Sequence, residues 1–587
     1  MIKKIIDYFD KDTRENFMVR LFTAWSITGI INFMNVPGKF IELQTTNNIS
    51  LSLSITYFVL SYVIITLLSH CFKKSDIDGW FFAISTLTYL TLIATFNASQ
   101  YYCLAVVFVA LLSVVYSVKR FTKSKNVVEP SKKTTLALMI PIVLIPIFVI
   151  GLIGVCRYLS FATPNFDFGI FSQMFYYMKT ELVPLTTCER EKLLSHFAVH
   201  LSPVYYLILP FYFIFPSPIT LQIAQTVILG SALIPLYLLA RHYKLSNKCT
   251  ILIMIAAAFY PALAGGTMYD IHENAFLLPF ILWIFYFAEK NKNIPMYIFM
   301  LLTFSVKEDA AIYVAFIALY FIFSGKKKLH GSVMFLSSII YFVFAVTILK
   351  KYGEGAMTGR FDNFITDPDK GLVDVIITIF KNPAYFLSQC LTAEKLLFVL
   401  FMLLPLGCLP VLSRKWSQFI LIGPLFLINL MSNYTYQHSI YFQYVYGTMA
   451  VFFYLAVVNI PSLPKNLKQY LVPSAAVFSI MMFAFSMTPR LNYVERVGVN
   501  KEDYVKIRAA LDTIEDDASV LSTTFYIPYL SQRKEIYEIE YCIVDTDYIV
   551  LDTRFESADK NRLKIDMSKY ELILEEKDLV EIYAKIK

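Results

Sequence analysis

The feature that most constrains this chain is a run of about twenty apolar residues that recurs along its length. A helix of that length spans the hydrocarbon core of a bilayer, where the backbone must hydrogen-bond to itself. The runs lack the alternation of a membrane barrel, so they predict helices. Of the 587 residues, 57% are hydrophobic and 16% are charged, whereas soluble domains carry about 25% charged residues. The predicted fold class is an all-α polytopic membrane protein.

About fifteen runs qualify as candidate spans. They are residues 18–36, 51–70, 79–97, 100–118, 134–156, 219–240, 249–266, 274–289, 294–306, 309–323, 331–350, 392–412, 416–431, 441–460 and 470–488. Residues 201–216 are apolar but short and broken by proline, and we interpret them as a re-entrant or interfacial helix pair. Two short crossing helices remain an alternative for this segment.

Basic loops orient a membrane protein, because lysine and arginine concentrate on the cytoplasmic side. The basic segments alternate with the spans if the N-terminus is cytoplasmic. These segments are Lys73 with Lys74, 119–125 with Lys132 and Lys133, 241–248, 289–293, 325–328, Arg414 with Lys415, and Lys465 with Lys468. We therefore expect a multi-pass protein of the plasma membrane, in contact with membrane lipids, with an extracytoplasmic C-terminus. Because the net charge of +8 is scattered through these loops, it does not indicate a nucleic-acid partner.

Composition divides the chain into three expected domains. Residues 1–125 form an N-terminal four-helix membrane bundle, and residues 126–489 form a transmembrane core with outer loops at 157–200 and 351–390. Residues 490–587 have the composition of a soluble domain, with a helical stretch, KEDYVKIRAALDTI, and short strands in ASVLSTT, DYIVLD and YEIEY. They predict a small extracytoplasmic α/β domain. Only Cys188 and Cys542 lie well outside apolar segments, and we do not expect them to form a disulfide bond.

Polar clusters gather on the expected outer face. Ionisable groups close to the membrane are costly and therefore indicate function. The clusters are NFDFGIFSQ, LSHFAVHLSP, MYDIHENAF, VKEDAA and NYTYQHSIYFQY. Together with Arg157 at the end of a span, they supply the candidate site residues: Asp167, Arg157, His196, His200, Asp270, His272, Glu273, Lys307, Glu308, Asp309 and His438. Because all five clusters lie on the expected extracytoplasmic side, they predict one polar site just beneath the outer surface.

Each cluster also has a structural interpretation, and these alternatives stay open. Asp167 suits a helix N-cap, and Lys307, Glu308 and Asp309 begin a span where carboxylates favour the helix dipole. Asp270 and Glu273 suit a solvated turn. His196 and His200 have the spacing of metal ligands on a helix, but no third ligand is identified, so packing or hydrogen bonding is the alternative. We assign no metal site, and a divalent cation remains an open possibility.

Several of these blocks resemble a known family. FDFGIFSQMFYY, HFAVHLSPVYYLILPFYFIFP, YDIHENAFLLPFILW and VKEDAAIYVAFIALY, together with the C-terminal ALDTIEDDASVLSTTFYIPYL, resemble the domain-of-unknown-function family numbered 2079, a set of prokaryotic membrane proteins. That family is in turn similar to the GT-C glycosyltransferases. The resemblance implies a GT-C-like core and a polyprenyl-phosphate-linked sugar as donor. It also implies, by position and residue type, that Asp167 acts as base or orients the acceptor. Glycosyl transfer needs cationic or hydrogen-bonding groups at the leaving phosphate, which Lys307, Arg157 and the histidines can supply. We therefore expect His196, His200, His272 and Lys307 near the phosphate.

Two other functions remain open. A lipid or glycan transporter or flippase would place ionisable groups near the midplane, often in inverted repeats, and no repeat is visible. A non-catalytic membrane scaffold would need residues 490–587 but would tolerate changes at Asp167.

Overall fold

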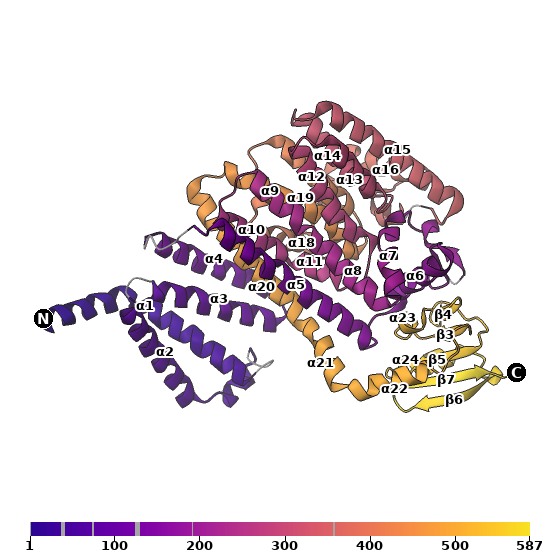
Figure 1. Ribbon diagram of the computed structural model, residues 1–587, viewed down its shortest axis with the longest axis horizontal. Helices are drawn as coiled ribbons and strands as arrows, with labels where there is room; N and C mark the ends of the chain where they lie inside the picture. Colours follow the sequence, from indigo (N-terminus) through magenta and orange to yellow (C-terminus); the bar gives the residue numbers. More distant parts are fainter. Residues whose placement is uncertain are drawn as a thin grey trace.

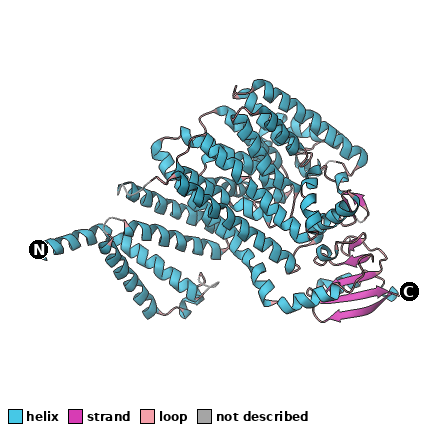
Figure 2. Cartoon of the chain, in the orientation of Figure 1, coloured by secondary structure: helices cyan, strands magenta, loops and turns pink. Residues whose placement is uncertain are grey.

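The computed structural model describes residues 2–36, 41–72, 76–123, 129–190, 192–355 and 358–586. Lys73, Lys74 and residues 124–128 lie outside the described residues. The predicted domain boundary at residue 125 falls within this gap. The structure is a large helical assembly with a five-stranded sheet and a separate pair of short strands (Figure 2). It confirms the predicted class, an all-α polytopic protein with a small C-terminal α/β region.

Most of the chain is helical, and the helices are interrupted by short 3-10 and π-helical turns. The α-helices are α1 (Ile2–Asn35), α2 (Leu51–Cys71), α3 (Ile77–Asn97), α4 (Gln100–Lys123), α5 (Lys132–Leu159), α6 (Ile170–Glu181), α7 (Leu209–Ile214), α8 (Pro218–Ser231), α9 (Leu233–His242), α10 (Asn247–Ala258), α11 (Pro261–Thr267), α12 (Leu277–Glu289), α13 (Asn293–Phe304), α14 (Ala310–Phe323), α15 (Lys328–Tyr352), α16 (Leu372–Lys381), α17 (Pro383–Cys390), α18 (Ala393–Leu403), α19 (Tyr446–Asn459), α20 (Lys465–Met487), α21 (Asn492–Val499), α22 (Lys501–Leu511), α23 (Ile527–Leu530) and α24 (Ser557–Arg562).

Each predicted span coincides with a helical segment, but the segments differ in length. Within the described residues, ten helices are long and apolar enough to cross a membrane, or eleven if the bent pair at 383–406 is one span. Helices α12, α13 and α14 have only 13, 12 and 14 residues. The number fifteen therefore counts helical segments rather than full-length spans.

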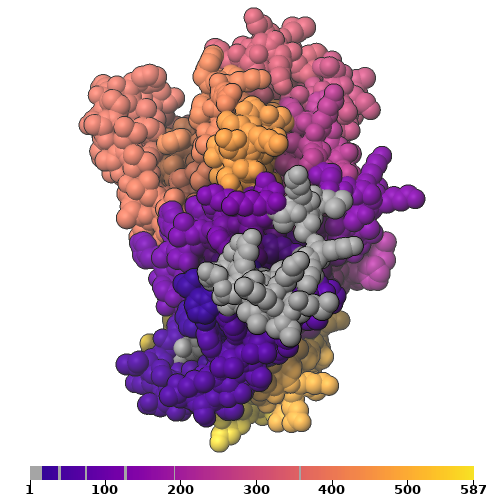
Figure 3. Space-filling model, turned by 90° about the vertical axis from the view of Figure 1, so that its left-hand side faces the viewer, coloured from indigo at the N-terminus to yellow at the C-terminus, as the bar shows by residue number. Residues whose placement is uncertain are grey.

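Helices α1–α4 pack against one another, and α3 and α4 contact the core through α20. Ion pairs join the helices of this bundle: Arg20 Nε lies 2.8 Å from Asp78 Oδ1 in a buried pair, and Arg120 Nη2 lies 2.7 Å from Asp76 Oδ1 in a partly buried one. The bundle lies to one side of the core in Figure 1, and in Figure 3 it covers the lower part of the face turned to the viewer.

The short core helices end where the chain carries charge. Helix α13 ends at Phe304 and α14 begins at Ala310, so the turn between them contains Lys307, Glu308 and Asp309. Helix α12 follows the turn η5 (Glu273–Phe276). The predicted re-entrant segment is a 3-10 turn, η4 (Pro203–Leu207), followed by the six-residue α7, and both are too short to cross a bilayer.

The C-terminal region is a five-stranded sheet in the order β4-β3-β5-β7-β6. Its strands are β3 (Val520–Ser522), β4 (Ile536–Glu538), β5 (Tyr548–Asp552), β6 (Tyr570–Glu576) and β7 (Val580–Lys585); the outer loop adds the pair β1 (Leu185–Thr186) and β2 (Leu194–Ser195). The three predicted strands are β3, β4 and β5, which pair in parallel. The antiparallel hairpin of β6 and β7 was not predicted.

This sheet is not separate from the membrane part. Its buried cluster combines Ile507, Val520 and Ile527 with Phe161 and Ile170 of the outer loop. Gly169 lies so close to α23 that an added Cβ would come within 2.9 Å of Ile527 Cγ2. Figure 1 shows the sheet beside α6 and α23, with α20–α22 leading to it from the core. The C-terminal domain therefore packs against and supports the segment 157–200, in which Asp167 lies.

Candidate active site

Asp167 and His272 are 105 residues apart in sequence, and both lie in turns that lead into helices. Asp167 is in the turn η2 (Asn165–Gly169) before α6, and His272 directly precedes η5. Asp167 Oδ2 lies 3.1 Å from His272 Nε2. The N-cap of α6 is Gly169, so Asp167 does not cap that helix. Its side chain is 24% exposed and faces a cavity of about 380 Å³.

Behind His272 lies a buried charge network. Glu273 Oε2 lies 2.9 Å from His272 Nδ1, and Glu273 Oε1 lies 3.2 Å from Lys307 Nζ. The Tyr205 hydroxyl donates to Glu273 Oε2 at 2.8 Å. All of these side chains are buried. A buried charge is stable only with such partners, so the network fixes the position of the imidazole that faces Asp167.

The two histidines of the outer loop bind different carboxylates. His196 Nδ1 lies 3.0 Å from Glu189 Oε2, and His200 Nδ1 lies 3.0 Å from Glu308 Oε1. They therefore do not form a pair of ligands for one metal. Burial opposes protonation of His196, but Glu189 raises its pKa. Burial, reinforced by Lys307, lowers the pKa of His200. His200 is therefore the more readily neutral of the two histidines at the edge of the cavity.

Arg157, Asp270 and His438 are among the predicted site residues that do not line this cavity. Arg157 Nη1 lies 2.6 Å from Asp270 Oδ1 and 2.7 Å from the Met268 carbonyl oxygen. Both charged side chains are buried, so this pair holds the 268–276 turn against α5. His438 lines a different cavity of about 180 Å³, and its Nε2 is 4.0 Å from Glu394 Oε2. Arg157, Asp270 and His438 therefore lie outside the Asp167 cavity.

A neighbouring cavity, of about 360 Å³, shares His200 and Arg360 with the first as lining residues. Its polar end contains Lys307, Glu308 and Asp309. The rest of its wall is largely apolar and comes from α14, α15, α16 and the turn η11 (Leu425–Leu430), through Ile312, Phe342, Val346, Val375, Ile376, Leu427 and Ile428. A polar cavity and a largely apolar one thus lie side by side, with His200 and Arg360 on the boundary between them.

Arg360 was not among the predicted site residues. Its guanidinium lies 4.9 Å from the Tyr434 ring centre and 5.1 Å from that of Tyr444, and Nη2 donates to the Tyr444 hydroxyl at 3.2 Å. Two tyrosines thus hold the cation between the cavities. Its only sequence signal was a cation within the long loop at 351–390, beside several other charges.

Metal binding is not favoured by the residues around Asp167. In the ranges that the structure describes, no group of three or more His, Cys, Asp or Glu side chains is arranged to hold an ion. A divalent cation there would have Asp167 as its carboxylate ligand, while the nearby histidine nitrogens Nδ1 face Glu189, Glu308 and Glu273.

The family described as "Predicted membrane protein (DUF2079)" matches residues 157–577. The chain belongs to this family. The match begins at Arg157 and includes Asp167, His272, Lys307 and most of the C-terminal sheet, while α1–α4 lie outside it. No protein of curated function matches the DUF2079 chain.

Two solved structures are similar to this DUF2079 protein. The crystal structure of ArnT from Cupriavidus metallidurans bound to undecaprenyl phosphate is 9% identical, with a TM-score of 0.49, over 78% of this chain and 99% of that one. The apo structure of ArnT from the same organism is 10% identical, with a TM-score of 0.42, over 75% and 98%. At this identity and TM-score we draw no functional conclusion from them.

The Glu273–Lys307 pair gives a stability prediction for the DUF2079 protein. We expect Glu273→Gln and Lys307→Met each to lower the free energy of unfolding by about 3–5 kcal/mol, because each leaves a buried charge without its partner. The double variant should lose less unfolding free energy than the sum of the losses in the two single variants. Thermal unfolding in detergent would measure this, and purely additive losses would contradict the pairing.

His272 gives a pH prediction. Burial opposes its charged form, but Glu273 and Asp167 outweigh burial and raise the pKa of His272 to about 9. A raised pKa stabilises the folded state fully below the ordinary histidine value of about 6.5, and this stabilisation is lost as the pH rises through about 9. Between pH 6.5 and 10 the wild type should therefore lose on the order of 3 kcal/mol more than His272→Gln. Equal losses in thermal unfolding would contradict the assignment.

Proposed function

We propose that this protein is a membrane glycosyltransferase of GT-C type that transfers a sugar from a polyprenyl-phosphate donor to an extracytoplasmic acceptor. The observation that carries the proposal is the boundary between the two cavities at His200 and Arg360. An amphiphilic ligand with an anionic group between a sugar and a long apolar chain matches this arrangement: a polar cavity, then basic residues, then an apolar cavity. A purely polar or purely apolar substrate would leave one of the two cavities unused.

The donor would bind with its phosphate between Lys307 and Arg360. Arginine forms charge-assisted hydrogen bonds with phosphate oxygens, and Lys307 supplies a second cation at the same end of the apolar cavity. Both groups would stabilise the negative charge that develops on the leaving oxygen. The polyprenyl chain would then lie along α14, α15 and α16, and the sugar would extend toward Asp167.

In the transfer step, Asp167 would accept the proton of an acceptor hydroxyl. The hydroxyl oxygen forms a bond to the anomeric carbon, the bond from that carbon to the phosphate oxygen breaks, and its electron pair stays on the released polyprenyl phosphate. His272 is a positioning residue, since it lies 3.1 Å from the carboxylate and is itself held by Glu273. Asp167 requires no cofactor for this proton transfer.

The proposed orientation puts the cavities and the C-terminal domain outside and the N-terminus in the cytoplasm. It is supported by the basic loops at the opposite helix ends. Lys326 follows α14 and lies 3.0 Å from Glu289 at the far end of α12, whereas Glu273 and Lys307 lie at the other ends of the same helices. Cytoplasmic loops carry the excess of basic residues.

A turnover assay tests the function without knowledge of the acceptor. The protein is reconstituted in nanodiscs with lipid-linked sugars extracted from its own membrane, and released polyprenyl phosphate is measured by mass spectrometry. We expect release with the wild type that depends on protein concentration and added envelope extract. A flippase would move the donor without releasing polyprenyl phosphate, so a lack of release would contradict the proposal.

A further inference from the structure

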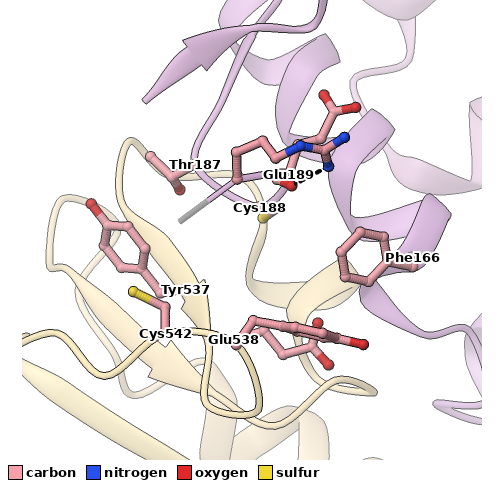
Figure 4. A pocket seen from close by; sticks show the side chains of 9 residues that line it. Phe166, Thr187, Cys188, Glu189, Tyr537, Glu538 and Cys542 are labelled. Atoms are coloured by element: carbon pink, nitrogen blue, oxygen red, sulfur yellow. Dashed lines mark hydrogen bonds between the residues drawn. The ribbon is translucent and has the colours of Figure 1, made fainter. Parts of the chain in front are cut away.

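Another cavity, of about 320 Å³, lies between the segment 157–200, called here the outer segment, and the C-terminal domain. Figure 4 shows Phe166, Thr187, Cys188 and Glu189 on the outer segment facing Tyr537, Glu538 and Cys542 of the domain. We refer to it as the interdomain cleft. Its two walls are joined by hydrogen bonds from Asn165 Nδ2 to Glu538 Oε2, at 2.8 Å, and from Thr187 Oγ1 to the Ile536 carbonyl oxygen, at 2.6 Å. The domain is therefore held in position to form one side of the cleft.

The interdomain cleft adjoins the Asp167 cavity. Phe166, Glu189, Arg190 and Tyr541 line both. The rings of Phe166 and Tyr541 lie 5.1 Å apart and meet edge to face. Because Phe166 directly precedes Asp167, a molecule in the cleft that passes this pair of rings reaches the carboxylate. The cleft approaches Asp167 from the side of the soluble domain, whereas the apolar cavity adjoins the Asp167 cavity at His200 and Arg360.

The lining of the cleft combines aromatic rings with charged groups. Tyr537, Tyr541 and Phe166 offer ring surfaces. The Glu538 and Glu189 carboxylates can accept hydrogen bonds from hydroxyls, and Arg190 can donate to ring or hydroxyl oxygens. A polyhydroxylated ring with apolar C–H faces satisfies both kinds of group. A lipid chain would instead favour an apolar surface such as the cavity of about 700 Å³ lined by Phe211, Ile223 and Val227.

We propose that the interdomain cleft binds the saccharide part of the acceptor and presents its hydroxyl to Asp167. This inference rests on the proposed function and adds the acceptor class to it. The C-terminal domain then contributes Glu538 and Tyr541 to substrate binding and does not serve only as support for the outer segment.

Binding of oligosaccharides to the full-length protein in nanodiscs tests this inference. The probes are maltotriose, chitotriose, mannotriose and xylotriose, measured by saturation-transfer NMR. We expect at least one to bind the wild type. Glu538→Gln should weaken that binding by about tenfold or more through loss of a charge-assisted hydrogen bond, and Tyr541→Ala should weaken it by about tenfold through loss of the ring surface that packs on the sugar. Tyr541 is 55% exposed, so its truncation should leave the fold intact.

The control is Glu575→Gln on β6, an exposed carboxylate of the same domain away from the cleft, which should bind like the wild type. All three variants should bind undecaprenyl phosphate as the wild type does. Binding of none of the four saccharides, or unchanged binding in both cleft variants, would overturn the inference. Failure of the wild type to bind undecaprenyl phosphate would instead count against the proposed function.

Discussion

Asp167→Asn is expected to reduce the release of polyprenyl phosphate by about 10²–10⁴-fold, the usual contribution of a positioned general base. Asparagine preserves the shape of the side chain and its hydrogen bonding to His272 but cannot accept the acceptor proton. Affinity for undecaprenyl phosphate should stay within about twofold of the wild type, because the phosphate is assigned to Lys307 and Arg360 and each 1.4 kcal/mol corresponds to tenfold. Single-turnover release and equilibrium binding measure the two effects separately.

Asp369→Asn is the matched control, since Asp369 is an exposed carboxylate in the loop at 351–390 and lines none of the cavities described above. It should behave as the wild type in both assays. Unchanged turnover in Asp167→Asn would remove Asp167 from the reaction. Loss of undecaprenyl phosphate binding in the same variant would mean that the carboxylate supports the fold rather than the chemistry.

Arg360→Gln is expected to weaken binding of undecaprenyl phosphate by about 10- to 100-fold, because a hydrogen bond to a charged group contributes about 1.5–3 kcal/mol. Glutamine retains polarity next to Tyr434 and Tyr444 but loses the charge. Binding to protein in nanodiscs, followed by native mass spectrometry, gives the dissociation constant. The effect should diminish for undecaprenol, which has the same chain without the phosphate.

The control for Arg360 is Arg496, which also lies over a tyrosine ring, 5.8 Å from the centre of Tyr493, but is exposed on α21. Arg496→Gln should leave undecaprenyl phosphate binding unchanged. If both variants weaken binding equally, the contribution of arginine is non-specific attraction to an anionic lipid. If neither does, the phosphate does not lie at the boundary between the cavities.

The membrane class, the helix positions and the parallel strands could be predicted because they depend on local patterns. Long apolar runs specify helices in lipid, and short apolar runs bounded by turn residues specify buried strands. The β6–β7 hairpin was missed because its strands, YELILEE and VEIYAK, are neither continuously apolar nor regularly alternating. Its charged residues gave it the composition of an exposed surface segment.

Of the predicted site residues, Asp167, His196, His200, His272, Lys307, Glu308 and Asp309 line one or both of the two neighbouring cavities, and their roles stay a prediction. The sequence did not show which charged side chains form ion pairs with one another. Arg157 and Asp270, 113 residues apart, neutralise each other, and His438 faces Glu394 in another cavity. Arg360 contacts Tyr434 and Tyr444, which come from a segment more than 70 residues later. Such contacts depend on tertiary packing and have no local signature.

In the proposed complex a single lipid occupies the two neighbouring cavities, with its phosphate at Arg360 and its polyprenyl chain along α15 and α16. Photo-crosslinking with an undecaprenyl phosphate analogue that carries a diazirine in its chain tests this most directly. We expect adducts at Phe342, Val346 and Ile376 that diminish in Arg360→Gln. Adducts at Phe211, Ile223 and Val227 instead, or a distribution unaffected by Arg360→Gln, would contradict it.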